Sequence, residues 1–109
     1  MRKGEIWFVK IPPTNGHEQG GTRPVLVLSE IEANTVIVVP FTSNIQALRF
    51  IHTIEIIPSQ LNGLKSKSIA LAFQMRAIDR KRLISKIGVL ENNTLKEIER
   101  MIKKVLVLE

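Results

Sequence analysis

Short apolar segments separated by turn-forming residues fill the first 90 residues of the chain, a pattern typical of β-strands. The segments at 4–11 and 51–58 alternate apolar and polar positions, whereas those at 24–30 and 35–42 are mostly apolar. The pattern predicts six strands, at residues 4–11, 24–30, 35–42, 51–58, 68–78 and 84–90. A turn is expected around Ala33–Asn34, another at 61–67, and a single helical turn at 79–83.

The end of the chain has the spacing of an amphipathic helix. Its apolar stripe, which we expect to pack in the core, consists of Leu95, Ile98, Met101, Ile102, Val105 and Leu106. Thr94 and Glu97 form a candidate capping box, and Asn93 is an alternative N-cap. Short strands followed by one helix predict a mostly β fold: a small, strongly bent sheet or barrel with a C-terminal α-helix, in one domain over residues 1–109.

The composition is that of a globular domain and argues against several classes of function. Hydrophobic residues make up 44% and charged residues 24% of the 109 residues, which argues against disorder. The chain has no cysteine, so disulfide and thiolate chemistry are excluded. Two histidines without a tight carboxylate cluster predict no metal site. No signal peptide is apparent and no apolar run approaches the roughly 20 residues of a membrane span, so we expect a cytoplasmic protein.

The net charge of +6 is unevenly distributed. Up to Leu64 the chain has five basic and five acidic residues, and from Lys65 onward it has eleven basic and five acidic ones. A basic surface favours polyanions or acidic protein partners. Charge alone is equally compatible with a soluble protein that happens to be basic.

The loop at 12–22 and the residue after it are the first candidates for chemistry. His17 and Glu18 are the only acid–base pair so close together in this chain, although a solvated loop explains them equally well. Arg23 precedes Pro24, which restricts it to an extended backbone at the strand entrance. A guanidinium held there is well placed to bind a phosphate with two parallel donors. A surface salt bridge with Glu18 is the alternative.

Two further segments bring polar side chains to strand ends. Thr42, Ser43 and Asn44 follow an apolar strand, where they either close a turn or donate hydrogen bonds to a phosphoryl oxygen. In the segment "FQMRAIDRKRL", Gln74, Arg76 and Ile78 are expected on one strand face. The basic run at 80–82 is either a solvated turn or part of a polyanion site.

Together, "GEIWFVKIPPTNGHEQGGTRPVLVLS", "VVPFTSN" and "SIALAFQMRAIDRKRL" resemble the MazF/PemK toxins of bacterial toxin–antitoxin pairs over nearly the whole chain. The resemblance implies a small SH3-like barrel of the MazF/PemK/CcdB type and a homodimer. It also implies a metal-independent endoribonuclease without cofactor that cuts single-stranded RNA to 2′,3′-cyclic phosphate and 5′-hydroxyl ends. A cognate antitoxin protein would neutralise it, and DNA would be contacted only through that antitoxin.

The family motifs map onto particular residues of this chain. Arg23 and Thr42 match the catalytic arginine and threonine, and Glu18 or His17 is the candidate general base. Gln74 and Arg76 match the family's QxR pair. Phe73 stands where certain relatives carry an acidic residue, so it is expected either in the core or as a stacking face. The residues expected to contact RNA are Thr14, Asn15, Gln19, Thr22, Ser43, Asn44, Gln74 and Arg76, with the segments 14–22 and 43–49 determining specificity.

Two alternatives from other classes follow from the same fold. One is a catalytically silent module that binds RNA or antitoxin, and the other is an inhibitor of DNA gyrase. A shared fold does not separate these functions, because function depends on the site. Arg23 together with Thr42 favours cleavage, and the C-terminus has no motif that supports the gyrase alternative.

Overall fold

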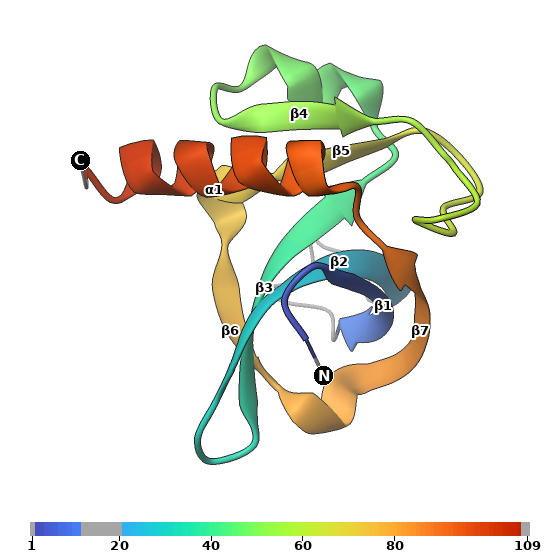
Figure 1. Ribbon diagram of the computed structural model, residues 1–109, viewed down its shortest axis with the longest axis vertical. Helices are drawn as coiled ribbons and strands as arrows, with labels where there is room; N and C mark the ends of the chain where they lie inside the picture. Colours follow the sequence, from blue (N-terminus) through green and yellow to red (C-terminus); the bar gives the residue numbers. More distant parts are fainter. Residues whose placement is uncertain (1, 12–20, 108–109) are drawn as a thin grey trace.

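The computed structural model describes residues 2–11 and 21–107, which form seven strands, three short 3₁₀ helices and one α-helix (Figure 1). The strands are β1 (Glu5–Ile11), β2 (Gly21–Ile31), β3 (Thr35–Thr42), β4 (Thr53–Ile56), β5 (Ser68–Leu71), β6 (Arg76–Asp79) and β7 (Leu83–Val89). The 3₁₀ helices are η1 (Ile45–Arg49), η2 (Ala72–Gln74) and η3 (Arg80–Arg82), and the α-helix is α1 (Asn92–Val105).

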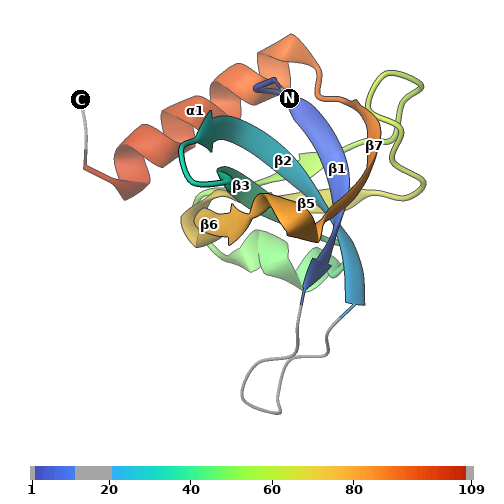
Figure 2. The ribbon, with the colours of Figure 1, turned by 90° about the horizontal axis from the view of Figure 1, so that it is seen from below.

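All strand pairs are antiparallel, in the order β4-β5-β3-β2-β1-β7, and β6 also pairs with β3. The long strands β1 and β2 curve strongly as they cross the molecule, with β7 beside β1 (Figure 2). The turn expected between β2 and β3 is present, with positive φ angles of 64° at Ala33 and 58° at Asn34. The prediction of a mostly β fold with a strongly bent sheet and a C-terminal helix is confirmed.

The strand predicted at 68–78 is wrong in one respect, because η2 divides it into β5 and β6. Both pieces pair with β3, β5 near its end and β6 near its start. The Met75 N–H donates to the Ala72 carbonyl at 3.3 Å, which closes the bend. The strand predicted at 51–58 is also shorter than expected, because His52 adopts a left-handed conformation, with φ 61°, just before β4.

The apolar runs of β2 and β3 are explained by burial on both faces of the sheet. On one face, Leu26, Val39 and Phe41 join the residues that pack under α1. On the other face lies a valine cluster, defined as Val9, Val25, Val27, Val36 and Val38. Because β-branched side chains have few rotamers, this cluster is a rigid base for the side chains that pack on its surface.

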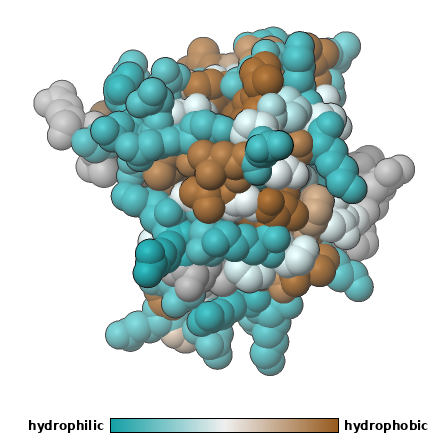
Figure 3. Space-filling view, turned by 45° about the vertical axis from the view of Figure 1, so that its right-hand side comes forward, coloured by the Kyte–Doolittle hydropathy of each residue, from teal (hydrophilic) through white to brown (hydrophobic). Residues whose placement is uncertain are grey.

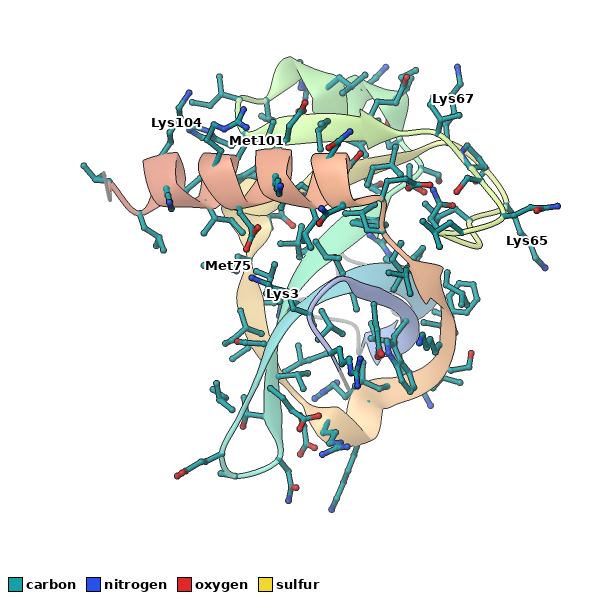
Figure 4. The ribbon with its side chains drawn as sticks, in the orientation of Figure 1. Lys3, Lys65, Lys67, Met75, Met101 and Lys104 are labelled. Carbon is teal, nitrogen blue, oxygen red and sulfur yellow. The ribbon has the colours of Figure 1, made fainter. Side chains whose placement is uncertain are left out.

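The terminal helix packs on the sheet through part of its predicted stripe. Leu95 and Ile98 are buried, and Met101 and Ile102 contact the same core, as does Met75, which lies below α1 in Figure 4. Leu106, however, is 48% exposed. None of the helices in the described residues is long and apolar enough to span a membrane.

The predicted cap of α1 is wrong. The helix begins at Asn92, with Glu91 in the N-cap position and no side-chain hydrogen bond to the first turn. The carboxylate of Glu91 instead accepts hydrogen bonds from Ser59 Oγ and Asn62 Nδ2. Glu91 therefore fastens the loop between β4 and β5 to the start of the helix.

That loop is built around the fully buried Asn62. Asn62 Oδ1 accepts from the N–H groups of Ser59 and Leu64, both at 3.0 Å, and Nδ2 donates to the Ile57 carbonyl as well as to Glu91. Gly63 has a φ of 69°, and a Cβ there would meet the Ile87 carbonyl oxygen at 1.9 Å, so no larger residue fits. The loop is thus closely packed against β7.

Candidate active site

The strand register brings Arg23 and Thr42 together. Val25 of β2 pairs with Pro40 of β3, and stepping two residues outward on each strand reaches Arg23 and Thr42. Because side chains alternate between faces, these two residues share the face of Val25 and Pro40. Arg23 is exposed and Thr42 is half-buried, so a polar pair lies above the valine cluster.

Arg23 and Thr42 line a cavity of about 520 Å³, called the main cavity below. Its apolar base includes Val9, Val25 and Val38 of the valine cluster. Its other described polar and aromatic lining residues come from several parts of the chain: Lys10, Asn44, Gln46, Arg49, Phe50, Phe73, Gln74, Arg76 and Arg82. With Arg23 included, five of the lining residues are cationic: Lys10, Arg23, Arg49, Arg76 and Arg82.

A second cavity, of about 360 Å³, adjoins the first and is called the side cavity below. Its polar lining residues are small or basic: Thr22, Ser43, Lys65, Ser66 and Ser68. Of the described residues, Arg23 and Thr42 alone line both cavities. They therefore form the boundary between two hollows, a suitable position for holding one phosphate with a nucleoside on either side.

Hydrogen bonds fix the backbone around Thr42. Its Oγ1 accepts from the Asn44 N–H at 3.2 Å, and Asn44 Oδ1 accepts from the Gln46 N–H at 3.0 Å to cap η1. The turn-closing interpretation of this segment is thus confirmed. A hydroxyl that accepts one hydrogen bond still has its own proton to donate, so the turn is compatible with a phosphate contact.

The other candidate residues divide between the two cavities. Asn44, Gln74 and Arg76 line the main cavity, and Thr22 and Ser43 line the side cavity. Ile78 also lines the main cavity, as its predicted strand face requires. The remaining candidates lie outside the described residues: Thr14, Asn15, His17, Glu18 and Gln19.

Three residues that line the main cavity differ from the expectations drawn from the sequence. Lys10 and Phe50 were not among the predicted contacts, and a core position for Phe73 is wrong, because its side chain is 36% exposed and lines the main cavity. The rings of Phe50 and Phe73 lie 5.5 Å apart at 52°, and the Arg49 guanidinium lies 5.0 Å from the Phe50 ring centre. The neighbouring Arg49–Phe50 pair in the sequence was the available signal.

The electrostatics of both cavities favour an anion. No acidic residue is found among the described residues that line either of them. Three acidic residues that form ion pairs lie outside both cavities: Glu5 with Lys86 at 3.3 Å, Glu30 with Arg80 at 3.5 Å and Glu99 with Lys3 at 2.7 Å. In the described part of the chain, no group of three or more histidine, aspartate or glutamate residues is arranged to hold a metal ion.

Trp7 packs against the valine cluster and lines neither cavity. It is half-buried, and its Nε1 donates to Glu5 Oε1 at 2.9 Å. Burial alone would raise the pKa of Glu5, but the hydrogen bond from Trp7 and the contact with Lys86 outweigh it, and the pKa is lowered. Glu5 thus stays ionised and holds the indole in place.

Comparison with known proteins identifies the family of the chain. The family model described as "PemK-like, MazF-like toxin of type II toxin-antitoxin system" matches residues 2–106. The chain belongs to this family. Within it, "Endoribonuclease EndoA" of Bacillus subtilis (strain 168) is 32% identical over 99% of this chain and 96% of that protein. "Endoribonuclease MazF" of Staphylococcus saprophyticus is 33% identical over 94% of this chain and 88% of that protein.

Solved MazF structures share the fold. A crystal structure of MazF from Deinococcus radiodurans superposes with a TM-score of 0.79 at 25% identity, over 99% of this chain and 97% of that one. A crystal structure of MazE–MazF from the same organism gives 0.77 at 27% identity, over 100% and 97% of the two chains. The family and fold that the sequence motifs indicated are therefore confirmed.

Proposed function

We propose that this protein is a toxin that cuts single-stranded RNA at internal phosphodiester bonds. The observation that carries the proposal is the position of Arg23 and Thr42 on the boundary shared by two cavities that lack described acidic residues. Single-stranded RNA offers a phosphate with a nucleoside on each side, which fits this arrangement. The relatives EndoA and MazF are named endoribonucleases, which supports the same activity.

The reaction we propose is an internal displacement at phosphorus. The ribose 2′-oxygen loses its proton to a general base and forms a bond to the neighbouring phosphorus. The bond from phosphorus to the 5′-oxygen then breaks, and that oxygen takes a proton. The products are a 2′,3′-cyclic phosphate and a 5′-hydroxyl, with no oxidant, metal or cofactor needed for the balance.

Arg23 and Thr42 would stabilise the charge that builds up on the phosphorane. The guanidinium has two parallel donors for the non-bridging oxygens, and Thr42 adds a hydroxyl donor. A guanidinium stays protonated near neutral pH and is a poor base there, so we assign Arg23 to charge stabilisation and propose in addition that it donates a proton to the leaving oxygen. Glu18 or His17 is the proposed base.

The expected partners are a cognate antitoxin and a second copy of this chain. The MazF relative from Deinococcus radiodurans forms a crystallised complex with MazE. Exposed large hydrophobic side chains on and next to η1, at Ile45, Leu48 and Ile51, support a protein interface on this surface. Figure 3 shows that, on the face it presents, hydrophobic side chains form separate patches among hydrophilic ones. We further propose a cytoplasmic location and DNA contact only through the antitoxin.

The test uses purified protein, a mixed RNA pool, a chelator, and sequencing of the cut ends with analysis of their phosphate chemistry. Arg23→Ala should lower the cutting rate by about 10²- to 10³-fold or more, and Thr42→Val by roughly 10- to 100-fold, since each removes a donor to the transition state. Arg100→Ala is the matched control, because Arg100 lies exposed on α1 outside both cavities.

Three results would contradict the proposal. The first is wild-type protein that binds RNA without cutting it, which would favour the silent binding module. The second is undiminished cutting by Arg23→Ala. The third is a requirement for added metal, which would replace the proposed reaction with another. Arg23→Ala should keep the wild-type circular dichroism spectrum and thermal midpoint, because Arg23 is exposed. Thr42→Val should keep the spectrum but lower the midpoint slightly, because it removes the acceptor of the Asn44 N–H.

A further inference from the structure

Phe50 and Phe73 form an aromatic pair inside the main cavity. Their ring centres lie 5.5 Å apart with an angle of 52° between the planes, and the Arg49 guanidinium lies 5.0 Å from the centre of the Phe50 ring. Phe50 is 46% exposed and Phe73 is 36% exposed, and neither belongs to a buried core cluster. Two large rings are thus left at a surface where packing does not explain them.

The backbone that carries these rings is fixed from several sides. The Phe50 N–H donates to the Ala47 carbonyl at 3.1 Å, and the Phe50 carbonyl accepts from Thr53 Oγ1 at 2.9 Å. A hydrogen bond of 3.1 Å from the Ala72 N–H to the His52 carbonyl joins the segment before β4 to the segment that carries Phe73. The backbone that carries the rings is therefore positioned before any ligand binds, which lowers the entropy cost of stacking on them.

The pair lies in the same cavity as Arg23 and Thr42, which form its boundary with the side cavity. The cavity also contains Arg76 and Arg82 and, among its described residues, no acidic one. An aromatic surface beside several cations is the usual arrangement for a base stacked next to a bound phosphate. An acidic protein segment would use the cations but has no base to place on the rings.

We propose that Phe50 and Phe73, with Arg49, form a stacking site for the nucleobase next to the scissile phosphate. This inference rests on the proposed function, because it takes Arg23 and Thr42 as the phosphate site. The nucleoside on the other side of the phosphate then occupies the side cavity, where Lys65 and the hydroxyls of Thr22 and Ser43 line the wall. Figure 4 shows Lys65 on the loop between β4 and β5.

The test is a double-mutant cycle between the protein and the RNA. The probe is a short RNA with the sequence that the wild-type protein cuts fastest in a mixed pool, made intact or with an abasic ribose on the 5′ or the 3′ side of the cut. Phe50→Ala should lower kcat/KM on intact RNA by roughly 5- to 100-fold, the loss expected for one base stacked on an aromatic ring. On RNA that is abasic at one of the two positions, Phe50→Ala should cause no further loss.

Conservative variants separate stacking from packing. Phe50→Trp should retain most of the activity, whereas Phe50→Leu, which keeps an apolar side chain without a ring, should behave as Phe50→Ala does. Ile84→Ala is the matched control, since Ile84 is 55% exposed on β7 and lines neither cavity. Lys65→Ala should reduce the salt dependence of cutting by about one phosphate contact, and its loss of activity should be equal on intact RNA and on RNA that is abasic at the position assigned to Phe50.

The outcomes distinguish this inference from the proposed function. If Arg23→Ala is inactive but Phe50→Ala loses the same factor on intact RNA and on both abasic RNAs, the stacking site is wrong and the phosphate site stands. If Arg23→Ala cuts normally, the proposed function itself fails. If Phe50→Ala loses activity together with a change in oligomeric state on gel filtration, the rings belong to a protein interface and the stacking site is wrong.

Discussion

Two asparagines close loops in this protein with opposite consequences for their surroundings. Asn62 is fully buried, and its amide makes four hydrogen bonds, three within the β4–β5 loop and one to Glu91. Asn44 is exposed at the main cavity and caps η1 through a single bond from Gln46 to its Oδ1. A polar group satisfied within the fold therefore supports stability, whereas one that faces a cavity remains available for a ligand.

The largest expected effect is a loss of stability in a variant of the buried Asn62. Asn62→Ala removes acceptors for the N–H groups of Ser59 and Leu64 and leaves Glu91 with one donor fewer. Unsatisfied buried groups cost about 1–3 kcal/mol each, so the free energy of unfolding should fall by about 3 kcal/mol or more. Urea unfolding monitored by circular dichroism measures this.

The same variant should keep its cutting rate per folded molecule, because Asn62 lines neither cavity. Cutting assays below the unfolding transition, normalised to the folded fraction, check this expectation. A folded Asn62→Ala protein with activity reduced by about 10-fold or more would mean that the loop takes part in the site. Unchanged stability would show that the hydrogen-bond network contributes nothing to the fold.

Asn44→Ala should show the reverse balance. The loss of a cap costs about 1 kcal/mol of stability at most for such a short helix. Because η1 carries Arg49 and precedes Phe50, loosening it should lower kcat/KM by about 10-fold. Asn44→Asp, which keeps an oxygen acceptor for the Gln46 N–H, should restore the stability but place a negative charge beside RNA phosphates. Equal losses of stability in Asn44→Ala and Asn62→Ala would break the comparison.

The smallest expected effect concerns acid. Burial alone would raise the pKa of Glu91, but hydrogen bonds from Ser59 and Asn62 outweigh it and lower the pKa below its ordinary value of 4.5. The stability contributed by this carboxylate is therefore fully present above about pH 4.5 and is lost as the pH falls through the lower, folded-state value.

Glu91→Gln tests that sign. It should cost about 1 kcal/mol near neutral pH, through the weakened hydrogen bonds from Ser59 and Asn62, and it should lose less stability than the wild type between about pH 7 and pH 3. Glu97→Gln, at an exposed position of α1, should change neither quantity. A steeper acid loss in Glu91→Gln than in the wild type would reverse the assigned sign.

Local patterns in the sequence were sufficient for most of the fold. The turn at Ala33–Asn34, the helical turn at 80–82 and the amphipathic helix all follow from spacing and turn chemistry. Arg23, Thr42, Asn44, Gln74 and Arg76 line one cavity, while their roles stay sequence-based predictions. The bend at η2 and the start of α1 were missed. Both depend on contacts between segments that are distant in the sequence. At the start of α1, for example, Glu91 accepts hydrogen bonds from Ser59 and Asn62 and does not cap the helix.

The aromatic pair was missed for the same reason. Phe50 and Phe73 are 23 residues apart in the sequence, which left Phe73 open as a core residue or a stacking face and gave no sign of its contact with Phe50. The antiparallel pairing of β4 with β5, which sets Thr53 opposite Leu71, brings the segments before β4 and after β5 to the same cavity. The residues at 12–20, which include the candidate bases Glu18 and His17, stay a sequence-based prediction.

The central claim is that Arg23 and Thr42 act on the same phosphate, and a double-mutant cycle under single-turnover conditions tests it most directly. Rates are measured for the wild type, Arg23→Ala, Thr42→Val and the double variant on one RNA. If both side chains stabilise one phosphorane, the double variant should be faster than the product of the two single losses predicts, with a coupling of about 1 kcal/mol or more. Two losses that multiply independently, or a single variant that cuts at the wild-type rate, would contradict the claim.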